Sequence, residues 1–435
     1  MRFEDLTGKT VVIWGAGREG RAAHAELGHR GITSTIVVTG SGDIPEGVIG
    51  GDAAWEALRH AGAIVKSPGI PHTSAEYLAL SEAGVQITSL TDLWLNENRE
   101  RVIAVTGTKG KSTTSALVHH ILRSTGHTAE LAGNIGIPVG AHVEESIDCA
   151  VTEISSYQAA ELSASPRVAV LTSLYPEHLP WHGGYDNYVA DKLKLIAFGP
   201  EKVVIPSRDG ELAERALAIA DEERIVTPAD LGIHVSESDI SWEGAGAIAL
   251  ADIPLRGTHN LANAALALTA VSIYSGDIDP AAALASLARF SPLAHRLEVV
   301  PSGDGRTWID DSLATAPQAV ALALSSVATG HTALVMGGAE RDLSFEPLIH
   351  ALEARPDVTV VCTGPAGQRF ARDAAERLTH IRIAENFADA LDIARSVTAA
   401  GDTILLSPGA PSFDEFADYE ARAAAFRSAA FRSEH

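Results

Sequence analysis

The sequence has few cysteines and few positive charges, and each shortage excludes a class of protein. Only Cys149 and Cys362 are cysteine among 435 residues, each in its own apolar run. A disulfide-stabilised secreted protein is therefore excluded, and two buried thiols in a reducing cytoplasm are expected. Lysine and arginine number 33 against 56 aspartate and glutamate, a formal charge of -23. This acidic excess argues against nucleic acid as a partner, because few cations are left to neutralise phosphates.

Long apolar runs are also missing. No run approaches the ~20 residues that span a bilayer. The N-terminal Met-Arg-Phe-Glu-Asp lacks the apolar core of a signal peptide, so we expect no membrane partner and a cytoplasmic location. Apolar residues make up 46% of the chain and charged residues 20%, which is typical of a globular protein. At about 150 residues per domain, the length predicts three domains.

Short apolar runs alternate with helical patterns, which predicts an α/β fold with parallel sheets. The first series has strands at 10–14, 35–38, 63–66 and 85–88. After a polar linker at 96–101, the second has strands at 102–105, 149–152, 168–171 and 203–205, an antiparallel excursion at 233–254, and helices at 260–274 and 280–287. The third has strands at 308–309, 332–336, 358–362 and 403–406. The predicted domains are 1–98, 99–293 and 294–435.

The most specific motif is Val105-Thr-Gly-Thr-Lys-Gly-Lys-Ser-Thr113, which an apolar run enters and a helical pattern leaves. Glycines in such a loop let backbone N–H groups wrap phosphate oxygens, while Lys111 reaches the terminal phosphates and Ser112 can ligate Mg2+. Val105 stands at the first glycine position of the general Walker pattern, so this is the compact Gly-Thr-x-Gly-Lys-Ser variant. A chance surface turn is disfavoured by the strand before it and the helix after it. The motif predicts ATP binding.

A second glycine loop, Gly15-Ala-Gly-Arg-Glu-Gly20, follows the first strand and opens a helix, as a dinucleotide fingerprint does. That fingerprint also expects an acidic residue about 20 positions later, whereas the second strand ends Val37-Val38-Thr39-Gly40. A nicotinamide cofactor is therefore disfavoured, which leaves a nucleotide-diphosphate substrate or a plain tight turn. Ser67-Pro68-Gly69 follows the third strand and fits either an approach to the same ligand or another turn.

Polar residues follow several strands of the central series. Glu153 ends a strand beside the phosphate loop, where it could ligate Mg2+ or cap a helix. Glu177 and His178 lie in a Pro- and Gly-rich loop of the kind where function concentrates. The helix that follows carries Lys192 and Lys194, and two lysines on a helix are most often solvated surface.

Further polar pairs lie near the second domain boundary, and each alone fits a cap, a surface charge or a turn. They are Asn260 and Asn263 at a helix start, His295-Arg296 before a strand and Asp311-Ser312 after one. The last strand runs into Ser407-Pro-Gly-Ala-Pro-Ser-Phe-Asp414. We expect this turn to open a helix whose backbone N–H groups could hold a carboxylate, although a plain connection fits equally.

In this order the motifs resemble the Mur ligase family of ATP-dependent amino-acid ligases of peptidoglycan synthesis, most closely the members that add glutamate to UDP-N-acetylmuramoyl-L-alanine. The resemblance covers essentially the whole chain. It rests on Gly107–Ser112, Gly133-Asn134-Ile135-Gly136, Glu153–Gln158, Glu177-His178, His259-Asn260, His295-Arg296, Asp311-Ser312 and the Ser407 loop. It implies a Rossmann-like N-terminal domain, a P-loop ATPase-like central domain and a Rossmann-like C-terminal domain.

The resemblance also implies a role for each matched residue. The UDP moiety would be bound by Gly15, Ala16, Gly17, Arg18, Ser67, Pro68 and Gly69, and the muramoyl-alanine end by Asn134, Ser156 and Gln158. ATP would be held by Gly107, Thr108, Lys109, Gly110, Lys111, Ser112, Thr113, Asn260, Asn263, Arg296 and Asp311. Further substrate contacts would come from Thr315, Arg341, Ser412, Phe413 and Tyr419 as the third domain closes over the amino acid.

Catalysis in the family joins phosphoryl transfer to amide formation. The substrate carboxylate becomes an acyl phosphate, which the incoming amine attacks. Lys111 would contact the transferred phosphoryl group, Ser112 and Glu153 would hold one Mg2+, and His178 the second. Lys192 matches a lysine that the family carbamylates, which turns a cation into a carboxylate-like metal partner. Metal ions and lysine are needed because charge accumulates on the phosphoryl oxygens.

Two positions depart from the members that add D-glutamate. Leu313 stands where they usually carry a lysine, and Arg341 replaces a second lysine. Losing a cation opposite a carboxylate weakens binding unless the planar fork of Arg341 replaces it. The amino-acid sequences of segments 14–23, 175–183 and 407–413 resemble the branch of the family that adds L-glutamate, whose product a separate epimerase inverts. Pro180 replaces an aspartate of many relatives, and we have no physical account of it.

Other functions stay open at this point. An ordinary D-glutamate-adding ligase needs only an altered pocket. A nicotinamide-dependent oxidoreductase rests on the Gly15 loop and is opposed by the missing ribose acid. A nucleotide-switched binding protein requires Glu153, His178 and Lys192 to be incidental. Folylpolyglutamate synthases lack a UDP-binding first domain of this kind.

Overall fold

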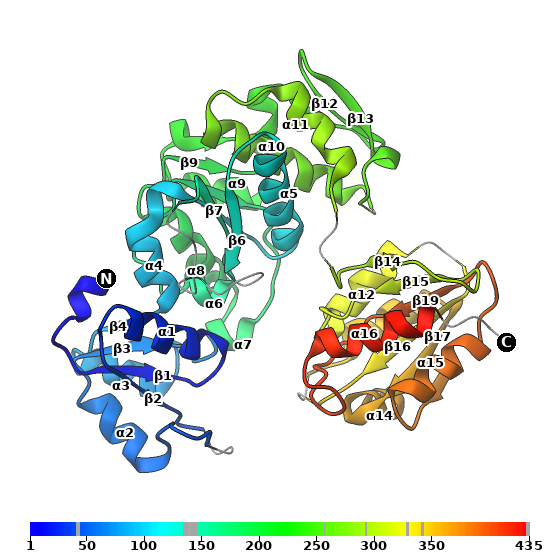
Figure 1. Ribbon diagram of the computed structural model, residues 1–435, viewed down its shortest axis with the longest axis horizontal. Coiled ribbons are helices and arrows are strands. Elements are labelled where there is room, and N and C mark those ends of the chain that lie inside the picture. Colours follow the sequence, from blue (N-terminus) through cyan, green and yellow to red (C-terminus); the bar gives the residue numbers. More distant parts are fainter. Residues whose placement is uncertain are drawn as a thin grey trace. The chain divides into compact units, whose positions relative to one another are not determined.

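The computed structural model describes residues 1–40, 44–133, 139, 146–255, 257–291, 294–327, 330–340 and 343–431. The chain divides into two compact units, Met1–Ser291 and Pro292–His435. Both units are α/β with mainly parallel sheets, which confirms the predicted fold class (Figure 1). The first unit holds two separate parallel sheets. The division into three domains stays a prediction.

The first sheet has four parallel strands in the order β2-β1-β3-β4. They are β1 (Val11–Trp14), β2 (Ser34–Val37), β3 (Ala63–Lys66) and β4 (Ile87–Thr88), with helices α1 (Arg18–His29), α2 (Gly51–Arg59), α3 (Ala75–Glu82) and α4 (Leu90–Asn98). Val11 and Ile13 pack with α1 and α4, whereas Val12 and Trp14 pack with α2 and α3. This alternation follows from the two-residue period of a strand.

The polar run at 96–101, predicted as a linker, is helical. It forms the end of α4 and the 3-10 turn η2 (Arg99–Arg101), which leads directly into the next strand. The Ser89 side chain caps the start of α4, and Trp94 and Leu95 are buried. Burial of these two large side chains holds the helix against the sheet, so the polar residues after them extend it.

The second sheet is parallel and has the order β10-β9-β8-β5-β7-β6. Its strands are β5 (Val102–Thr106), β6 (Ala129–Gly133), β7 (Cys149–Glu153), β8 (Val168–Leu171), β9 (Lys202–Val204) and β10 (Ile225–Val226). Helix α5 (Lys111–Ser124) follows β5 and packs against α10 (His259–Ser275), and α8 (Tyr185–Ala197) covers Ala104 and Ala169. Because β5 lies between β7 and β8, the loop after it meets the carboxyl ends of both neighbours.

The predicted antiparallel excursion is present beyond this sheet. It consists of β11 (Ile233–Val235), β12 (Asp239–Trp242) and β13 (Gly246–Ala249). Helix α9 (Glu211–Leu217) precedes it in sequence, and α10 and then α11 (Pro280–Ser286) follow it. The predicted helix at 260–274 is α10, and that at 280–287 is α11.

The second unit has one sheet in the order β14-β15-β19-β16-β17-β18. The strands are β14 (Glu298–Val300), which is antiparallel, and the parallel β15 (Thr307–Asp310), β16 (Thr332–Gly337), β17 (Val358–Thr363), β18 (Ile381–Ile383) and β19 (Thr403–Leu406). One face packs against α12 (Pro317–Ser326), α13 (Glu346–Glu353) and α14 (Gly364–Asp373). The other packs against α15 (Phe387–Ser396) and α16 (Tyr419–Ala430), so each face has its own core.

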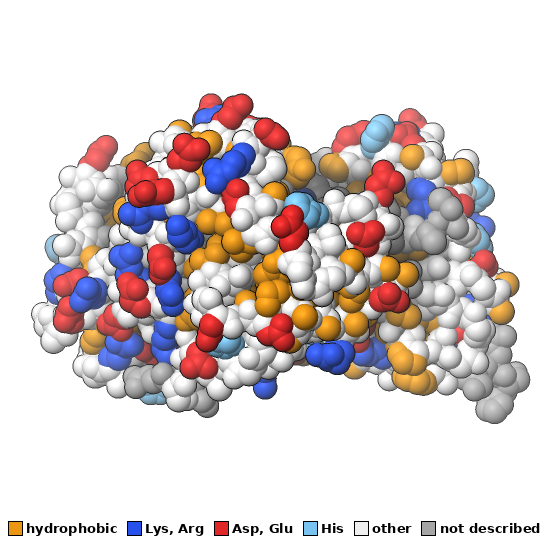
Figure 2. All heavy atoms as spheres, turned by 90° about the horizontal axis from the view of Figure 1, so that it is seen from above, with side chains coloured by type: hydrophobic (Ala, Val, Ile, Leu, Met, Phe, Trp, Pro, Cys, Tyr) orange, Lys and Arg blue, Asp and Glu red, His pale blue; other side chains and the backbone are white. Residues whose placement is uncertain are grey.

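Both cysteines are buried and free, as predicted. Burial raises the pKa of each thiol to about 12, so neither is a reactive thiolate at neutral pH. Among the described residues, no helix combines the length and hydropathy needed to cross a membrane. On the face drawn in Figure 2, lysine and arginine side chains lie among aspartate and glutamate. Ion pairs also form between exposed side chains, such as Arg215 and Asp186 at 2.7 Å.

Candidate active site

The phosphate loop has the predicted strand–loop–helix geometry. Gly107 has φ +150° and Gly110 φ +88°, both outside the range that L side chains readily adopt. A methyl group at Gly107 would lie 1.9 Å from Thr172 Oγ1, and one at Gly110 would lie 2.5 Å from Asn263 Oδ1. Glycine is thus required at both positions. The amides of the first turn of α5, which include Ser112 and Thr113, form the positive end of the helix dipole that suits a phosphate.

The residues after β8 wrap this loop. Thr108 N donates to Ser173 O at 2.8 Å, and Thr172 Oγ1 donates to Lys109 O at 2.5 Å. The Thr108 hydroxyl lies 2.7 Å from the Tyr188 hydroxyl on α8. These hydrogen bonds hold the phosphate loop in place, and both partners of each bond belong to the protein.

Two asparagines of α10 lie beside the phosphate loop, as the resemblance implies. Asn263 Nδ2 donates to Asn260 Oδ1 at 2.8 Å, and Thr114 Oγ1 on α5 donates to Asn263 Oδ1 at 3.3 Å. Both asparagines are buried. The packing of α10 on α5 therefore brings two polar side chains from about 150 residues further along the chain to the loop.

Lys192 is buried, with a relative exposure of 2%. Its Nζ donates to Gly107 O at 2.8 Å and lies 4.9 Å from the centre of the Tyr188 ring, one turn earlier on α8. Burial, reinforced by the charge of Lys111, lowers the pKa of Lys192 well below its ordinary value. The solvated-surface interpretation is wrong for Lys192, whereas the Lys194 side chain is 38% exposed.

Glu153 is the last residue of β7 and is buried at 1% exposure. It pairs in register with Val105 of β5, so its position is the carboxyl edge of the sheet. The helix cap that follows is Ser155, whose Oγ accepts from Gln158 N at the start of α6 (Ser156–Ala159). Since Ser155 performs the capping, the interpretation of Glu153 as a cap is wrong.

Glu177 and His178 occupy the loop before α7 (Leu179–His182). Lys109 Nζ donates to Glu177 Oε1 at 2.6 Å, and this cation outweighs burial and lowers the pKa of Glu177. His178 has φ +56°, a left-handed conformation that is uncommon outside glycine and that marks constrained sites. Its ring lies 4.9 Å from the ring of Tyr157, and burial lowers its pKa.

The two loops expected to bind UDP lie side by side in the first sheet. Ser67 N donates to Trp14 O, and Ser67 Oγ donates to Gly15 O at 3.3 Å. A methyl group at Gly20 would lie 1.9 Å from Gly15 O, so the first turn of α1 approaches the loop closely. In the place of the dinucleotide-binding acid stands Thr39, whose hydroxyl accepts from Trp14 Nε1 at 3.1 Å.

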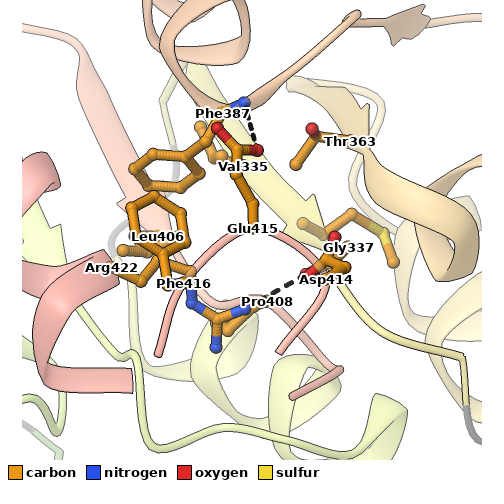
Figure 3. Close-up of a pocket in the computed structure, with 12 residues that line it drawn as sticks. Val335, Gly337, Thr363, Phe387, Leu406, Pro408, Asp414, Glu415, Phe416 and Arg422 are labelled. Carbon is orange, nitrogen blue, oxygen red and sulfur yellow. Dashed lines mark hydrogen bonds between the residues drawn. The ribbon is translucent and has the colours of Figure 1, made fainter. Parts of the chain in front are cut away.

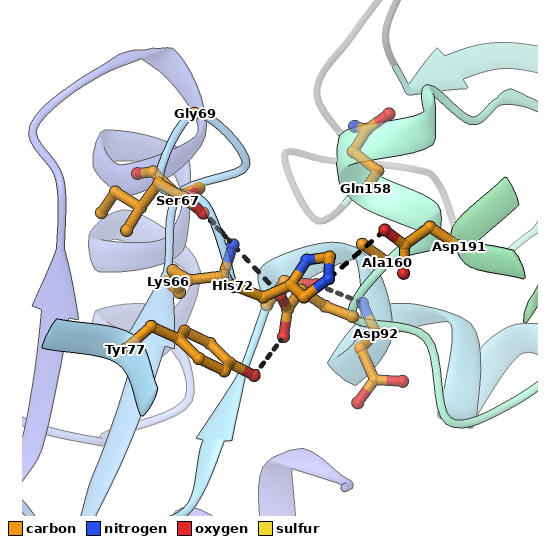
Figure 4. Close-up of polar contacts among 12 residues, drawn as sticks. Lys66, Ser67, Gly69, His72, Tyr77, Asp92, Gln158, Ala160 and Asp191 are labelled. Atoms are coloured by element: carbon orange, nitrogen blue, oxygen red, sulfur yellow. Dashed lines mark hydrogen bonds and ion pairs between the residues drawn. The ribbon is translucent and has the colours of Figure 1, made fainter. Parts of the chain in front are cut away.

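Polar contacts join the first and second sheets beside these loops (Figure 4). Buried Lys66 and Glu161 pair at 3.1 Å, and the Tyr77 hydroxyl donates to Glu161 Oε2 at 3.2 Å. Gln158 Nε2 donates to Glu19 Oε1 on α1 at 2.6 Å, while its Oε1 accepts from Ser155 N. Both ends of the Gln158 amide are thus engaged within the protein.

In the second unit, Asp311 follows β15 and is buried. Ser407 Oγ donates to Asp311 Oδ2 at 2.7 Å. Burial raises the pKa of Asp311 to about 7, against the Ser407 hydrogen bond and the charge of exposed Arg296, which lower it. His295 Nδ1 lies 2.8 Å from Asp310 Oδ2, and His295 has φ +62°. The sequence pairs 295–296 and 311–312 are therefore brought together by β14 and β15.

A small pocket lies at the carboxyl ends of β16 and β19 (Figure 3). Arg422 of α16 is one of its lining residues and is buried, at 3% exposure. The guanidinium donates to Gly337 O at 3.3 Å, Ala410 O at 3.1 Å and Ser312 O at 3.5 Å. Burial lowers the pKa of Arg422 to about 10, which leaves it cationic at neutral pH. Arg422 thus joins the end of β16 to the Asp311-Ser312 pair and to the Ser407 loop, although no motif had marked it.

The Ser407 loop does not open a helix, contrary to the prediction. The next helix, α16, begins only at Tyr419, and the Asp418 side chain caps it by accepting from Ala421 N. The helix amides are therefore not at the loop. Ser412 is buried, Thr315 is half-buried, Phe413 is 70% exposed, and the Tyr419 ring lies 5.7 Å from that of His295. Asn134 and Arg341 lie outside the described residues.

Sequence reasoning missed several polar residues of the site. They are Tyr188, Thr172 and Ser173 around the phosphate loop, His182 and Asp191 beside α6, and Arg422 in the second unit. Tyr188 could have been found, because it lies four residues before Lys192 and thus on the same face of one helix. Asp191 and Arg422 carry no such signal, since their roles depend on loops distant in sequence.

Comparison with protein families finds two matches along the chain. Residues 105–271 match the Mur ligase middle domain, and residues 295–409 match the Mur ligase glutamate ligase domain. Among similar curated proteins, a UDP-N-acetylmuramoyl-L-alanine--L-glutamate ligase of Salinispora tropica is 36% identical over 99% of both chains. The ligase of the same name from Xanthomonas axonopodis pv. citri is 35% identical over 97% of this chain and 95% of the relative.

Solved structures with the same fold are more distant in sequence. The UDP-N-acetylmuramate-alanine ligase MurC of Thermotoga maritima has a TM-score of 0.59 at 16% identity, over 97% of this chain and 98% of that one. The Mycobacterium tuberculosis folylpolyglutamate synthase complexed with ADP has a TM-score of 0.58 at 20% identity, over 80% of this chain and 94% of that one. These likenesses concern the fold alone.

Proposed function

Because the chain belongs to the Mur ligase family of ATP-dependent amino-acid ligases, we propose that it adds glutamate to UDP-N-acetylmuramoyl-L-alanine in peptidoglycan precursor synthesis. The substrate and the amino acid follow from the names of full-length relatives at 35–36% identity. L-Glutamate is the favoured amino acid, and an epimerase would then invert the product. The free, buried thiols are in keeping with a cytoplasmic reaction.

The observation that carries the proposal is the buried lysine beside the phosphate loop. A lysine with a strongly lowered pKa is neutral enough to react with CO2, which forms an N-carboxylate and releases a proton. Lys192 is therefore suited to carbamylation, and a carbamate at this depth replaces a buried amine by an anion that can pair with a cation. The charges of Lys111, Glu153 and Glu177 act on Lys192, which supports a role in the site rather than a merely structural one.

The donor set around the loop fits ATP and two Mg2+ ions. Ser112 and Glu153 supply a hydroxyl and a carboxylate, the oxygen ligands that Mg2+ prefers, and carbamylated Lys192 would add a third oxygen donor. His178, which has a left-handed backbone and a ring 4.9 Å from that of Tyr157, would hold the second ion. Bound Mg2+ supplies charge neutralisation at the phosphoryl oxygens. Asn260 and Asn263 would hold the nucleotide beside the glycine-bearing loop, with Arg296 and Asp311 contributing from the second unit.

The chain's own residues have separable tasks in the reaction. Lys111 would contact the transferred phosphoryl group as the substrate carboxylate becomes an acyl phosphate. The glutamate amine then attacks the acyl carbon, and phosphate leaves with the bonding electron pair. The Gly15 and Ser67 loops would hold the UDP moiety, with Ser156 and Gln158 nearer the muramoyl-alanine end. The amino acid would be contacted by Thr315, Ser412, Phe413, Tyr419 and Arg341. Of these, Arg341 would supply the positive charge that Leu313 cannot.

The test is phosphate release by purified protein with Mg2+, ATP and UDP-N-acetylmuramoyl-L-alanine, comparing L-glutamate with D-glutamate. Release with L-glutamate alone is expected. Release with D-glutamate alone would make the protein an ordinary D-glutamate-adding ligase with an altered pocket. Release with neither would favour the nucleotide-switched binding protein.

A second experiment addresses Lys192 directly. We expect activity to fall in bicarbonate-depleted buffer and to return when bicarbonate is added. Lys192→Ala should lose activity by at least about a hundredfold, because catalytic electrostatic groups contribute on that scale. Lys202→Ala, a partly exposed lysine whose Nζ donates to Glu223 O, is the control. Full activity of Lys192→Ala without bicarbonate would contradict the assignment.

A further inference from the structure

Ser156, His182 and Asp191 form a continuous chain of hydrogen bonds beside Lys192. Asp191 Oδ2 lies 2.7 Å from His182 Nδ1, and His182 Nε2 lies 3.1 Å from Ser156 Oγ. All three residues are buried, and His182 is completely inaccessible to solvent. They come from three different elements, α6, α7 and α8, so their alignment is a product of the tertiary fold.

The tautomer of His182 sets the direction of these bonds. An ionised carboxylate only accepts hydrogen bonds, so Asp191 requires the hydrogen of His182 to be on Nδ1. In the neutral ring Nε2 then carries a lone pair and accepts from the Ser156 hydroxyl. With its hydrogen committed to His182, the Ser156 oxygen can only accept from any further partner.

We propose that Asp191 and His182 orient the Ser156 hydroxyl as an acceptor for the alanyl amide N–H of the muramoyl-alanine substrate. The inference rests on the proposed function. It adds the substrate group that Ser156 contacts, the alanyl amide N–H, and the direction of that hydrogen bond. Ser156 lies three residues after Glu153, at the carboxyl edge of the second sheet. Among the N–H donors of the substrate, this amide is nearest the reacting carboxylate, from which one carbon atom separates it.

Asp191 has two further ion-pair partners, Lys194 on its own helix α8 and His72 from a segment distant in sequence. His72 Nε2 lies 3.4 Å from Asp191 Oδ2, and Lys194 Nζ lies 3.6 Å from Asp191 Oδ1 (Figure 4). His72 follows Gly69 of the candidate UDP loop, whose carbonyl accepts from Trp181 Nε1 at 3.3 Å. The orientation of Ser156 is therefore tied to the loop expected to hold the other end of the same substrate.

The order of contacts is that of a Ser-His-Asp triad, in which the serine is the nucleophile. A ligase of this kind needs no serine ester, because the acyl phosphate already carries a good leaving group. Ser156 is accordingly a binding residue, while His182 and Asp191 are positioning residues. They act on substrate affinity through the hydroxyl that they orient.

The first test uses a substrate analogue in which an ester oxygen replaces the alanyl N–H, UDP-N-acetylmuramoyl-L-lactate. We expect wild-type protein to bind it about tenfold more weakly than UDP-N-acetylmuramoyl-L-alanine in calorimetric titration, the scale of one lost hydrogen bond. Ser156→Ala should bind the alanyl substrate about tenfold more weakly and show no further loss with the analogue. A tenfold preference that persists in Ser156→Ala would overturn the inference. Failure of wild-type protein to bind either compound would instead refute the proposed function.

The second test reverses the direction of the hydrogen bonds along the chain from residue 191 to Ser156, with a side chain of the same shape at position 191. In Asp191→Asn the new amide can donate to His182 Nδ1, which moves the ring hydrogen to Nε2 and turns the serine hydrogen outward. We expect 15N spectra of labelled histidine to show the change of tautomer, with the signal assigned from His182→Gln. The tenfold preference for the alanyl substrate should disappear.

The matched control is Asp186→Asn, on the same helix but exposed and paired with Arg215. It should keep both the tautomer and the preference. Thermal unfolding of each variant checks that the fold is retained. An Nε2–H tautomer in the wild type, or an unchanged preference in folded Asp191→Asn, would show that Asp191 and His182 do not orient Ser156.

Discussion

Gly110 combines a left-handed backbone with a crowded surrounding. Its φ is +88°, and a methyl group there would lie 2.5 Å from Asn263 Oδ1. Gly126, just beyond α5, has a similar φ of +94° but nothing within 4 Å of such a methyl group. Substitutions at both glycines would strain the backbone, but only a substitution at Gly110 would also displace Asn263. Comparing the two therefore distinguishes these effects.

We predict that Gly110→Ala weakens ATP binding at least about tenfold, whereas Gly126→Ala changes stability only. Both variants carry the left-handed cost of about 1–2 kcal/mol, but only the first displaces Asn263 from the loop. ATP affinity by calorimetry and thermal unfolding measure the two effects. Equal ATP affinities in the two variants would mean that Asn263 does not contribute to the site.

Glu19 carries a pH dependence that belongs to a single side chain. Burial raises the pKa of Glu19 to about 7, although the hydrogen bond from Gln158 and the charges of Arg18 and Lys66 lower it. The ordinary pKa of a glutamate side chain is 4.5, so the folded protein holds this proton more tightly than the unfolded chain. Stability from this group is therefore present below pH 4.5 and is lost as pH rises towards 7.

Between pH 5 and pH 8 the wild-type protein should lose up to about 3 kcal/mol of unfolding free energy through ionisation of Glu19. We predict that this loss is absent in Glu19→Gln. Glutamine keeps an acceptor for Gln158 but cannot ionise. Urea unfolding followed by tryptophan fluorescence reports mainly the first unit, because Trp308 alone of the six tryptophans lies in the second. A wild-type pH profile in the variant would assign the titration elsewhere.

At the level of elements, prediction succeeded where a strong local signal coincided with a buried strand. The β5–loop–α5 segment was predicted because an apolar run, two glycines and a helical pattern follow one another. β6 (Ala129–Gly133) was missed because Ala-Glu-Leu-Ala-Gly contains few strand-forming residues, and β10 (Ile225–Val226) because it has only two residues. The chain between Ser407 and Tyr419 was misjudged as a helix start, since Asp418 rather than the glycine-bearing turn caps α16.

The candidate site was predictable to the same degree. Strand ends of a parallel sheet meet at one edge, so the neighbouring positions of Gly15 and Ser67 followed from their strands. The depth of Lys192 did not follow, because a lysine on a helix does not reveal which face is buried. The alignment of Ser156 with His182 depends on how α6 and α7 pack, which no local pattern contains.

Lys66 and Glu161 join β3 to the end of α6 by a buried ion pair at 3.1 Å. We predict that Glu161→Gln lowers the unfolding free energy by about 3–5 kcal/mol, because it leaves a buried ammonium without its counter-charge. The double variant Lys66→Met with Glu161→Leu should recover most of this loss, since apolar side chains need no partner there. Urea unfolding of both variants is the measurement. Additive losses in the double variant would show that the two side chains act independently.

Arg422 joins α16 to three loops through backbone carbonyls. We predict that Arg422→Lys raises the KM for glutamate at least about tenfold and leaves the KM for the UDP substrate unchanged. Lysine keeps the charge but lacks the planar fork that reaches several acceptors at once. Arg427→Lys, on the same helix and 32% exposed, is the control. Parallel rises in both KM values would point to a global loss of structure instead.

At the level of the whole molecule, each compact unit has cores of its own. In the first unit, apolar side chains fill both faces of the first sheet and the α8 face of the second. In the second unit, Ile309 and Leu334 pack on one face of the sheet and Trp308 and Val335 on the other. A unit with a complete core is expected to fold by itself.

We predict that a fragment of residues 1–291 folds cooperatively and binds UDP-N-acetylmuramoyl-L-alanine with an affinity within about threefold of the full chain. The Gly15 and Ser67 loops and the Ser156 hydroxyl all lie within this fragment. The same fragment should lack ligase activity, because Arg296, Asp311 and the proposed amino-acid contacts belong to the second unit. Circular dichroism during heating tests folding, calorimetric titration tests binding, and phosphate release tests activity. A fragment that folds but does not bind the UDP substrate would mean that recognition of that substrate extends beyond residue 291.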